Sequence, residues 1–325
     1  MNRRRILCLA IAGFAAGPAF AQGKVLRIGY LSTRASRTSI DDAFVAGLRD
    51  LGYAEGRNVA IEYRWAGNDM TRLRPLADEL VALKVDVIVT ATTAGVRAAM
   101  EATRTIPIVM AAAADPVGAG LVASLGRPGG NVTGVSLQTT DMARKRLQLA
   151  LELVPGAKRI GLLAEKVVSP AHGTTATLVA ETRAAVEAAG LQLTSIEVAS
   201  AAGLPAAFAD FGRAKAQVAI VQVSPLFLQH AARVVELAAK ERLPAIYEAR
   251  NFVDAGGLVS YGPDLLTTYR RAAAYVDRIL KGAKPGDLPV EQPDKFALVV
   301  NLRAAQGIGF TVPQSLQVRA DDVLR

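Results

Sequence analysis

The sequence predicts an α/β protein built from two similar lobes. Apolar segments of strand length alternate with amphipathic segments of helix length, which is the pattern of parallel sheets covered by helices. The alternation runs to about residue 136 and restarts at residue 142. A chain of 325 residues, 51% of them hydrophobic, also exceeds what one hydrophobic core usually serves. We therefore predict two lobes, each with a parallel sheet flanked by helices.

The first 21 residues are predicted to be a signal peptide rather than part of the fold. Three arginines at 3–5 precede an apolar stretch at 6–16, and Ala19-Phe20-Ala21 has the small residues of a cleavage site. The apolar stretch is too short to span a bilayer, which argues against the alternative of a membrane anchor. We expect a periplasmic protein cleaved near Ala21. The arginines also partly fit a twin-arginine signal, so both export routes stay open.

Export changes how the charge and the cysteine are interpreted. Loss of the three signal arginines lowers the formal charge from +9 to about +6. Scattered basic residues on an exported protein indicate a solvated surface, and no nucleic-acid partner is expected. The single cysteine, Cys8, lies in the signal, so we expect no disulfide, thiol nucleophile or cysteine metal site in the mature chain.

The first array contains four predicted strand–helix pairs. Residues 39–42 resemble a capping box at a helix start, and Gly52 ends that helix. An apolar run at 106–114 indicates a buried strand that stops at Asp115-Pro116. The predicted strands are 25–31, 58–65, 86–90 and 106–114, and the predicted helices are 39–51, 71–83, 93–102 and a short one at 117–125.

The second array repeats the pattern, and a tail of further elements follows it. No repeat is visible at the level of individual residues. Strands are predicted at 159–164, 191–198, 217–223, 244–247, 258–261 and 296–300. Helices are predicted at 142–153, 174–189, 204–215, 226–241 and 265–280, with a helical turn at 250–254 and a last helix near Leu302.

Three irregular extended segments, at 131–136, 256–263 and 289–296, interrupt the alternation. If each crosses between lobes, the two lobes form a clamp with a three-segment hinge. The predicted division is residues 22–134 with 260–290 in the first lobe, and residues 135–259 with 291–325 in the second.

The usual signatures of catalysis are missing from the sequence. It contains no phosphate loop, no dinucleotide fingerprint after the first strand and no nucleophile elbow. The two histidines, His172 and His230, are far apart and lack the spacing of metal ligands. The sequence therefore predicts neither an enzyme nor a cofactor or metal site.

Long, ordered motifs then indicate a family. The chain resembles the substrate-binding proteins of bacterial ABC transporters across essentially the whole mature sequence. The motifs that carry the resemblance are Asp115-Pro116-Val117, residues 120–125 and 127–134, Glu62-Tyr63-Arg64-Trp65, residues 243–247, 256–263 and 288–293, and the segment from Asn301 to Asp321.

The resemblance implies a class I periplasmic-binding fold, in which two Rossmann-like lobes close on a small solute. It also implies a membrane permease with an ATPase as partner, and some members of the family bind aromatic amino acids. Two loops of this chain depart from the amino-acid-binding pattern. The loop at 33–36 lacks the frequent His-Pro, and the loop at 165–170 lacks the frequent Asn-Pro. An aromatic amino acid as ligand is therefore in doubt.

Ligand contacts are expected where strands end and helices begin, facing the cleft. Thr92 and Thr93 would hold an anion at a helix start, Asp115 would accept a hydrogen bond, and a tyrosine would stack on the ligand. Several of these residues have an alternative role as helix caps. The candidates are Ser32, Thr33, Ser36, Thr92, Thr93, Asp115 and Pro116 from the first lobe, Glu165, Ser169, Ser224, Pro225, Tyr247 and Arg250 from the second, and Ser136 and Tyr261 near the hinge.

The predicted function is capture of a small molecule, such as an amino acid or related carboxylate, for delivery to the permease of an ABC importer. We expect a monomer. An exported sensory protein that presents its bound ligand to a membrane receptor is the alternative, because it would use the same clamp. An exported α/β enzyme is a third possibility, but it would need a nucleophile–base pair or a metal.

Overall fold

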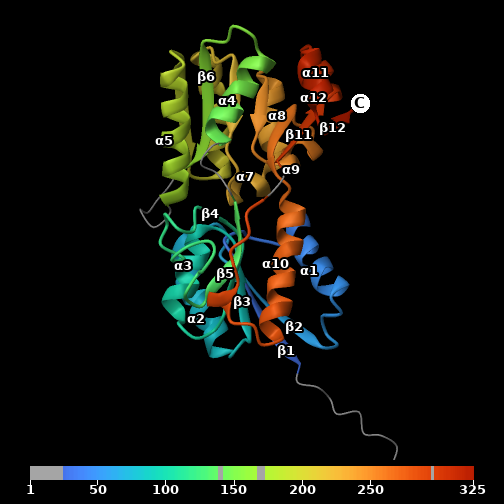
Figure 1. Ribbon diagram of the computed structural model, residues 1–325. Helices are drawn as coiled ribbons and strands as arrows, with labels where there is room; N and C mark the ends of the chain where they lie inside the picture. The colour runs from blue at the N-terminus through green and yellow to red at the C-terminus, as the bar shows by residue number, and fades with distance from the viewer. Residues whose placement is uncertain (1–24, 138–141, 167–172, 294–295) are drawn as a thin grey trace, which may run out of the picture.

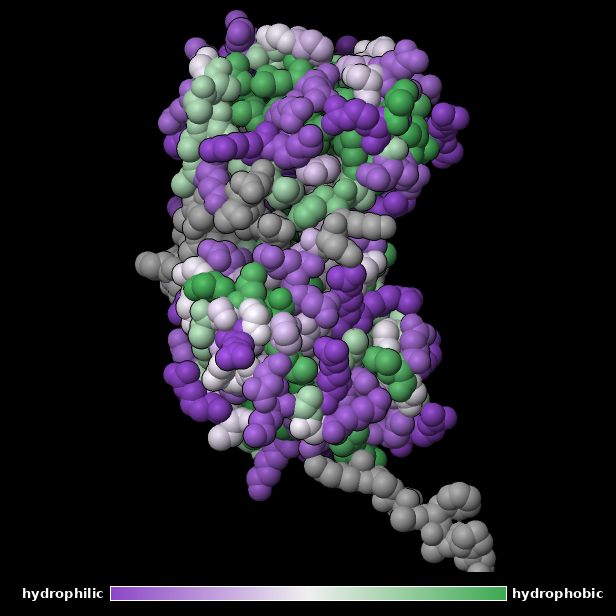
Figure 2. Space-filling model, in the orientation of Figure 1, coloured by the Kyte–Doolittle hydropathy of each residue, from purple (hydrophilic) through white to green (hydrophobic). Residues whose placement is uncertain are grey.

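The computed structural model describes residues 25–137, 142–166, 173–293 and 296–325. They form two α/β lobes, placed one above the other in Figure 1. Lobe 1 contains a five-stranded sheet and lobe 2 a seven-stranded sheet. Hydrophilic residues cover much of the face of both lobes seen in Figure 2. The predicted fold class is confirmed.

The sheet of lobe 1 has the strand order β2-β1-β3-β4-β5, and all neighbouring strands are parallel. Helices α2 and α3 pack on one face, and α1 and α10 pack side by side on the other (Figure 1). Its elements are β1 (Leu26–Ser32), α1 (Ser39–Asp50), β2 (Val59–Trp65), α2 (Leu73–Ala82), β3 (Val87–Thr90), α3 (Thr93–Ala102), β4 (Ile108–Ala114), β5 (Val132–Leu137) and α10 (Leu265–Leu280).

The sheet of lobe 2 has the order β12-β11-β10-β9-β8-β6-β7. Strand β11 runs antiparallel to β10, so this sheet is mixed rather than wholly parallel. Its elements are α4 (Met142–Leu153), β6 (Arg159–Glu165), α5 (Gly173–Ala188), β7 (Gln192–Val198), α6 (Leu204–Arg213), β8 (Val218–Val221), α7 (Pro225–Gln229), α8 (Ala231–Lys240), β9 (Ala245–Tyr247), α9 (Arg250–Asp254), β10 (Val259–Pro263), β11 (Phe296–Asn301), α11 (Leu302–Gly307), α12 (Gln314–Arg319) and β12 (Asp322–Leu324).

The chain passes between the lobes three times. It leaves lobe 1 after β5, returns between β10 and α10, and crosses again after Glu291. The outgoing and final crossings lie side by side, because the Ser136 amide donates to the Glu291 carbonyl at 2.8 Å and the Glu291 amide donates to the Gly134 carbonyl at 3.0 Å. The lobe boundaries predicted from the sequence stay predictions.

Two of the expected helices differ in the structure. Residues 117–125 form turns rather than a helix, since the positive φ of Gly120 (67°) is incompatible with a continuous right-handed helix. The predicted helix at 226–241 is divided into α7 and α8 at His230, whose φ of −111° is not helical. The short strand β12 was not predicted.

Candidate functional site

The two sheets share one topological feature that places the site. In lobe 1 the strand order reverses between β1 and β3, and in lobe 2 it reverses between β6 and β8. Ligands of open α/β sheets bind beyond the carboxyl ends of the strands at such reversal points. A cavity of about 190 Å³ lies there, bordered by loops that follow all four strands.

The cavity has mostly apolar walls with a few polar groups. One water needs about 10–15 Å³ by the same kind of measure, so the space accommodates a small organic molecule. Its lining residues are Arg34, Ile40, Asn68, Met70, Ala91, Thr92, Thr93, Ala94, Ala112, Ala114, Leu137, Leu265 and Tyr269 from lobe 1, and Glu165, Lys166, Leu178, Ala199, Val223, Ser224, Pro225 and Leu228 from lobe 2.

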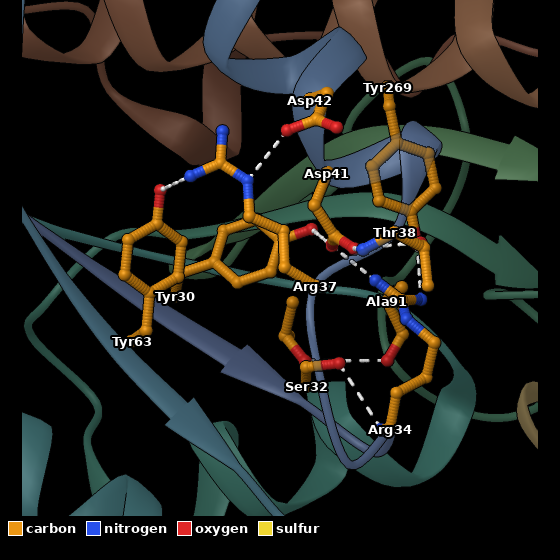
Figure 3. A network of polar contacts seen from close by, with 11 residues as sticks. Tyr30, Ser32, Arg34, Arg37, Thr38, Asp41, Asp42, Tyr63, Ala91 and Tyr269 are labelled. Atoms are coloured by element: carbon orange, nitrogen blue, oxygen red, sulfur yellow. Dashed lines mark hydrogen bonds and ion pairs between the residues drawn. The ribbon is translucent and has the colours of Figure 1, made fainter. Parts of the chain in front are cut away.

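Arg34 is the buried cation of this cavity. Its side chain is 4% exposed and forms an ion pair with the fully buried Asp41. Asp41 also accepts hydrogen bonds from the Tyr30 hydroxyl at 2.5 Å and from the amide and hydroxyl of Thr38 at 2.7 and 2.8 Å (Figure 3). These partners satisfy both carboxylate oxygens, so Asp41 holds Arg34 in place without needing the ligand.

The Arg34 guanidinium has one donor without a partner among the described residues. Its Nη1 lies 3.5 Å from the hydroxyl of Tyr269, whereas its Nε is buried without a hydrogen-bond partner among the described residues. Burial lowers the pKa of Arg34, but Tyr269 and Asp41 outweigh this effect and the pKa is raised overall. Arg34 therefore remains charged, and its Nε can donate to a ligand oxygen.

The start of α3 is a second part of the cavity lining that favours an anion, because the helix dipole is positive there. Thr92 has φ 67°, a conformation that costs energy for a β-branched residue, and its Oγ1 accepts from the Gly95 amide at 3.3 Å. Thr93 is the first residue of the helix and is 5% exposed. The positive end of the helix dipole and the Arg34 guanidinium both favour an anionic ligand group.

Lobe 2 contributes the opposite wall. Ser224 caps α7 by accepting from the Phe227 amide at 3.1 Å, and Pro225 begins that helix. Glu165 ends β6 and Lys166 follows it, at the other side of the reversal point. The two lobes therefore enclose the cavity between them.

The structure thus brings five of the predicted residues together at the cavity: Thr92, Thr93, Glu165, Ser224 and Pro225. Ser32 and Thr33 are buried just behind it, where the Ser32 hydroxyl accepts from the Arg34 amide at 3.2 Å. Ser36 is exposed and is not in the lining. Ser169 lies outside the described residues.

Asp115 and Pro116 shape a turn beside the site. The Asp115 carboxylate accepts from the Gly118 amide at 2.9 Å, and the Pro116 carbonyl accepts from the Leu121 amide at 2.8 Å. Neither residue is among the described residues that line the cavity. The turn fixes the end of β4, and the last residue of that strand, Ala114, lines the cavity.

The remaining candidates have partners elsewhere. Tyr247 is 1% exposed and stacks on Phe252, with the ring centroids 5.0 Å apart. The Ser136 amide donates to the Glu291 carbonyl on the final crossing. The other two residues lie in lobe 2, Arg250 in ion pairs with Asp254 and Asp322, and Tyr261 beside Phe296. None of these four appears among the described lining residues.

Sequence reasoning missed Arg34, Asn68 and Tyr269. Arg34 lies within the loop whose departure from the family pattern was noticed, and that departure was the signal that could have identified it. Tyr269 belongs to α10, far along the chain, and nothing in its local sequence indicates a cavity.

The described parts of the chain contain no cluster of three or more His, Cys, Asp or Glu residues that could bind a metal ion. In the same residues, no helix is both long and apolar enough to cross a membrane.

Comparison with known proteins identifies the family. A family model described as ABC transporter substrate binding protein matches residues 30–324. The chain belongs to this family. A curated relative from Clostridioides difficile (strain R20291), described as a tyrosine-binding protein, is 29% identical over 274 residues, which cover 83% of this chain and 77% of the relative.

Solved structures agree with this assignment. An ABC domain from Streptococcus pneumonia in complex with L-Trp is 30% identical, with a TM-score of 0.81 over 92% of this chain and 99% of that one. A conserved domain protein from Vibrio cholerae O1 biovar El Tor is 28% identical, with a TM-score of 0.83 over 92% of this chain and all of the other.

Proposed function

We propose that this substrate-binding protein captures a small amino acid or related carboxylate in the cavity between its lobes. The observation that carries the proposal is the buried, unpartnered Nε of Arg34 beside the start of α3, in an otherwise mainly apolar cavity. A carboxylate can interact with both the Arg34 Nε and the start of α3, and the apolar walls of the cavity fit the side chain of an amino acid. The relatives described with tyrosine and with L-Trp support an amino acid as ligand.

The ligand contacts follow from the lining residues. Arg34 and Thr92 would bind the carboxylate, while Thr93 and Ser224 would complete the polar rim, and the ring of Pro225 would add to the apolar wall. Ile40, Leu178 and Leu228 would surround the ligand's apolar part. The missing His-Pro and Asn-Pro loops argue that the preferred side chain differs from those of aromatic amino acids.

Membership of the family supports the wider role that we propose. The N-terminal signal would direct the protein to the periplasm, with cleavage near Ala21. There the closed, ligand-bound monomer would deliver its cargo to the permease of an ABC importer without altering it chemically. Deletion of the gene should abolish uptake of the labelled ligand; intact uptake with a lost cellular response to the ligand would instead favour the sensory role.

Binding can be tested by thermal unfolding of the mature protein with the common L-amino acids, and with 3-phenylpropionate and indole-3-propionate as carboxylates that lack the ammonium. A ligand at 100 times its Kd adds about 2.7 kcal/mol to the free energy of unfolding. Calorimetric titration of each hit then gives its affinity. Stabilisation by sugars or nucleobases, with none by carboxylates, would contradict the proposed ligand class.

A further inference from the structure

Asn68 lies beside Arg34 because their two loops are joined by backbone hydrogen bonds. Asn68 follows β2, and its amide donates to the Thr33 carbonyl at 2.8 Å. The preceding Gly67 amide donates to the Arg34 carbonyl at 3.0 Å. Both Asn68 and Arg34 line the cavity. The spatial relation between the two side chains is therefore set within lobe 1.

The side-chain amide of Asn68 also reaches lobe 2. Its Nδ2 donates to Oε1 of Gln229, the last residue of α7, at 2.9 Å. Its Oδ1 is buried and has no hydrogen-bond partner among the described residues. A buried acceptor left without a partner costs about 1–3 kcal/mol, so this oxygen favours a ligand that donates to it.

Arg34 and Asn68 thus present an unpaired donor and an unpaired acceptor from adjoining loops. An α-amino acid carries the complementary pair, a carboxylate and an ammonium on neighbouring carbons. We propose that Oδ1 of Asn68 accepts a hydrogen bond from the ligand's ammonium while the oxygen of Gln229 pairs with the Asn68 nitrogen. This inference rests on the proposed function, because it names the contact by which the protein distinguishes an amino acid from a carboxylate that lacks the ammonium.

The role of Gln229 follows from the symmetry of a carboxamide. Rotation by half a turn would exchange the oxygen and nitrogen of Asn68, and the cavity would then face a donor. Gln229 is also a carboxamide and can rotate in the same way, so a ligand group that only donates, such as an ammonium, decides that the Asn68 oxygen faces it. The Gln229 oxygen then pairs with the Asn68 nitrogen, which is the arrangement in the structure.

The backbone of Asn68 decides which variants are informative. Its φ is 64°, a conformation open to Gly, Asn and Asp but strained for most other residues. Asn68→Gly removes the amide without backbone strain. Asn68→Asp keeps an acceptor toward the cavity, and Gln229 can turn its own nitrogen toward the new carboxylate.

The test compares, by calorimetric titration, the L-amino acid that stabilises the protein most in thermal unfolding with the carboxylate that lacks only its α-ammonium. L-tryptophan with indole-3-propionate, and L-phenylalanine with 3-phenylpropionate, are two further pairs. We expect the wild-type protein to bind the amino acid of at least one pair ten or more times more tightly than its ammonium-free counterpart. In Asn68→Gly this ratio should fall below threefold. Asn68→Asp and Gln229→Glu should retain it, whereas Gln229→Met should lower it. Gln306→Met, an exposed glutamine of α11, is the matched control.

Two outcomes separate the possible failures. If Asn68→Gly keeps the wild-type ratio, another group, such as Glu165, binds the ammonium. This inference is then wrong, and the proposed function is unaffected. If the wild-type protein binds none of the common L-amino acids, or binds the amino acid and the carboxylate of each pair equally, the amino-acid ligand is wrong as well.

Discussion

Arg146 and Glu248 form a buried ion pair in lobe 2, with Nη1 and Oε1 2.7 Å apart and both side chains at most 4% exposed. The Arg146 Nε also donates to the Tyr261 carbonyl at 3.2 Å, and the second Glu248 oxygen accepts from the Val223 amide at 3.0 Å. Because Val223 lines the cavity and Tyr261 belongs to β10, the pair connects α4 and β10, the strand before the second crossing, to the cavity.

Replacement of Arg146 by Met should therefore destabilise the protein strongly. Glu248 would be left as a buried charge without its partner, which typically costs about 3–5 kcal/mol. Urea denaturation followed by circular dichroism measures this loss. Arg233→Met, which breaks the exposed pair with Glu236, is the control and should cost less than about 1 kcal/mol. Equal losses in the two variants would show that the Arg146 pair has no special structural role.

Arg34→Lys should separate ligand binding from folding. Lysine retains a positive charge for Asp41 but has no donor at the position of the Arg34 Nε. We expect at least tenfold weaker binding of the best amino acid found by thermal unfolding, with the folded state preserved. Arg37→Lys is the control, because Arg37 pairs with Asp42 outside the cavity lining. Unchanged affinity of Arg34→Lys would remove Arg34 from the ligand contacts.

Gly134→Ala should disrupt the first crossing. Gly134 has φ 132°, and an added Cβ would lie 2.2 Å from the Met110 carbonyl oxygen of β4. The combined overlap and backbone strain should cost about 2–4 kcal/mol in the free energy of unfolding. Gly130→Ala, where an added Cβ meets nothing within 4 Å, should cost far less. Equal denaturation midpoints for the two variants would contradict this account of β5.

Tyr63 should make the stability of lobe 1 depend on alkaline pH. Burial, followed by the nearby Glu55, raises the pKa of Tyr63 to about 12, against about 10 in an unfolded chain. The stabilising contribution of the neutral phenol is complete below pH 10 and is lost as the pH rises toward 12. Urea midpoints at pH 9 and pH 11 should therefore differ less in Tyr63→Phe than in the wild type. The same difference in both proteins would refute the assignment.

Much of the fold could be predicted because its signals are local. Strand and helix periodicity and the apolar run of β4 each depend on residues within a few positions. The capping box of α1 is formed by Thr38 and Asp41, one position before the box predicted at 39–42. Predictions failed where backbone geometry decided the outcome. The turn at 117–125 carries a helix-like pattern, but the positive φ of Gly120 interrupts it.

The sequence by itself determined the two α/β arrays and the family, since both are written in contiguous motifs. Only the tertiary structure decided which polar residues line the cavity. Arg34 is oriented by Asp41 of α1 and by Tyr269, 235 residues away, and Asn68 is oriented by Gln229, 161 residues away. The direction of a loop side chain depends on partners that folding brings together, and no local pattern encodes them.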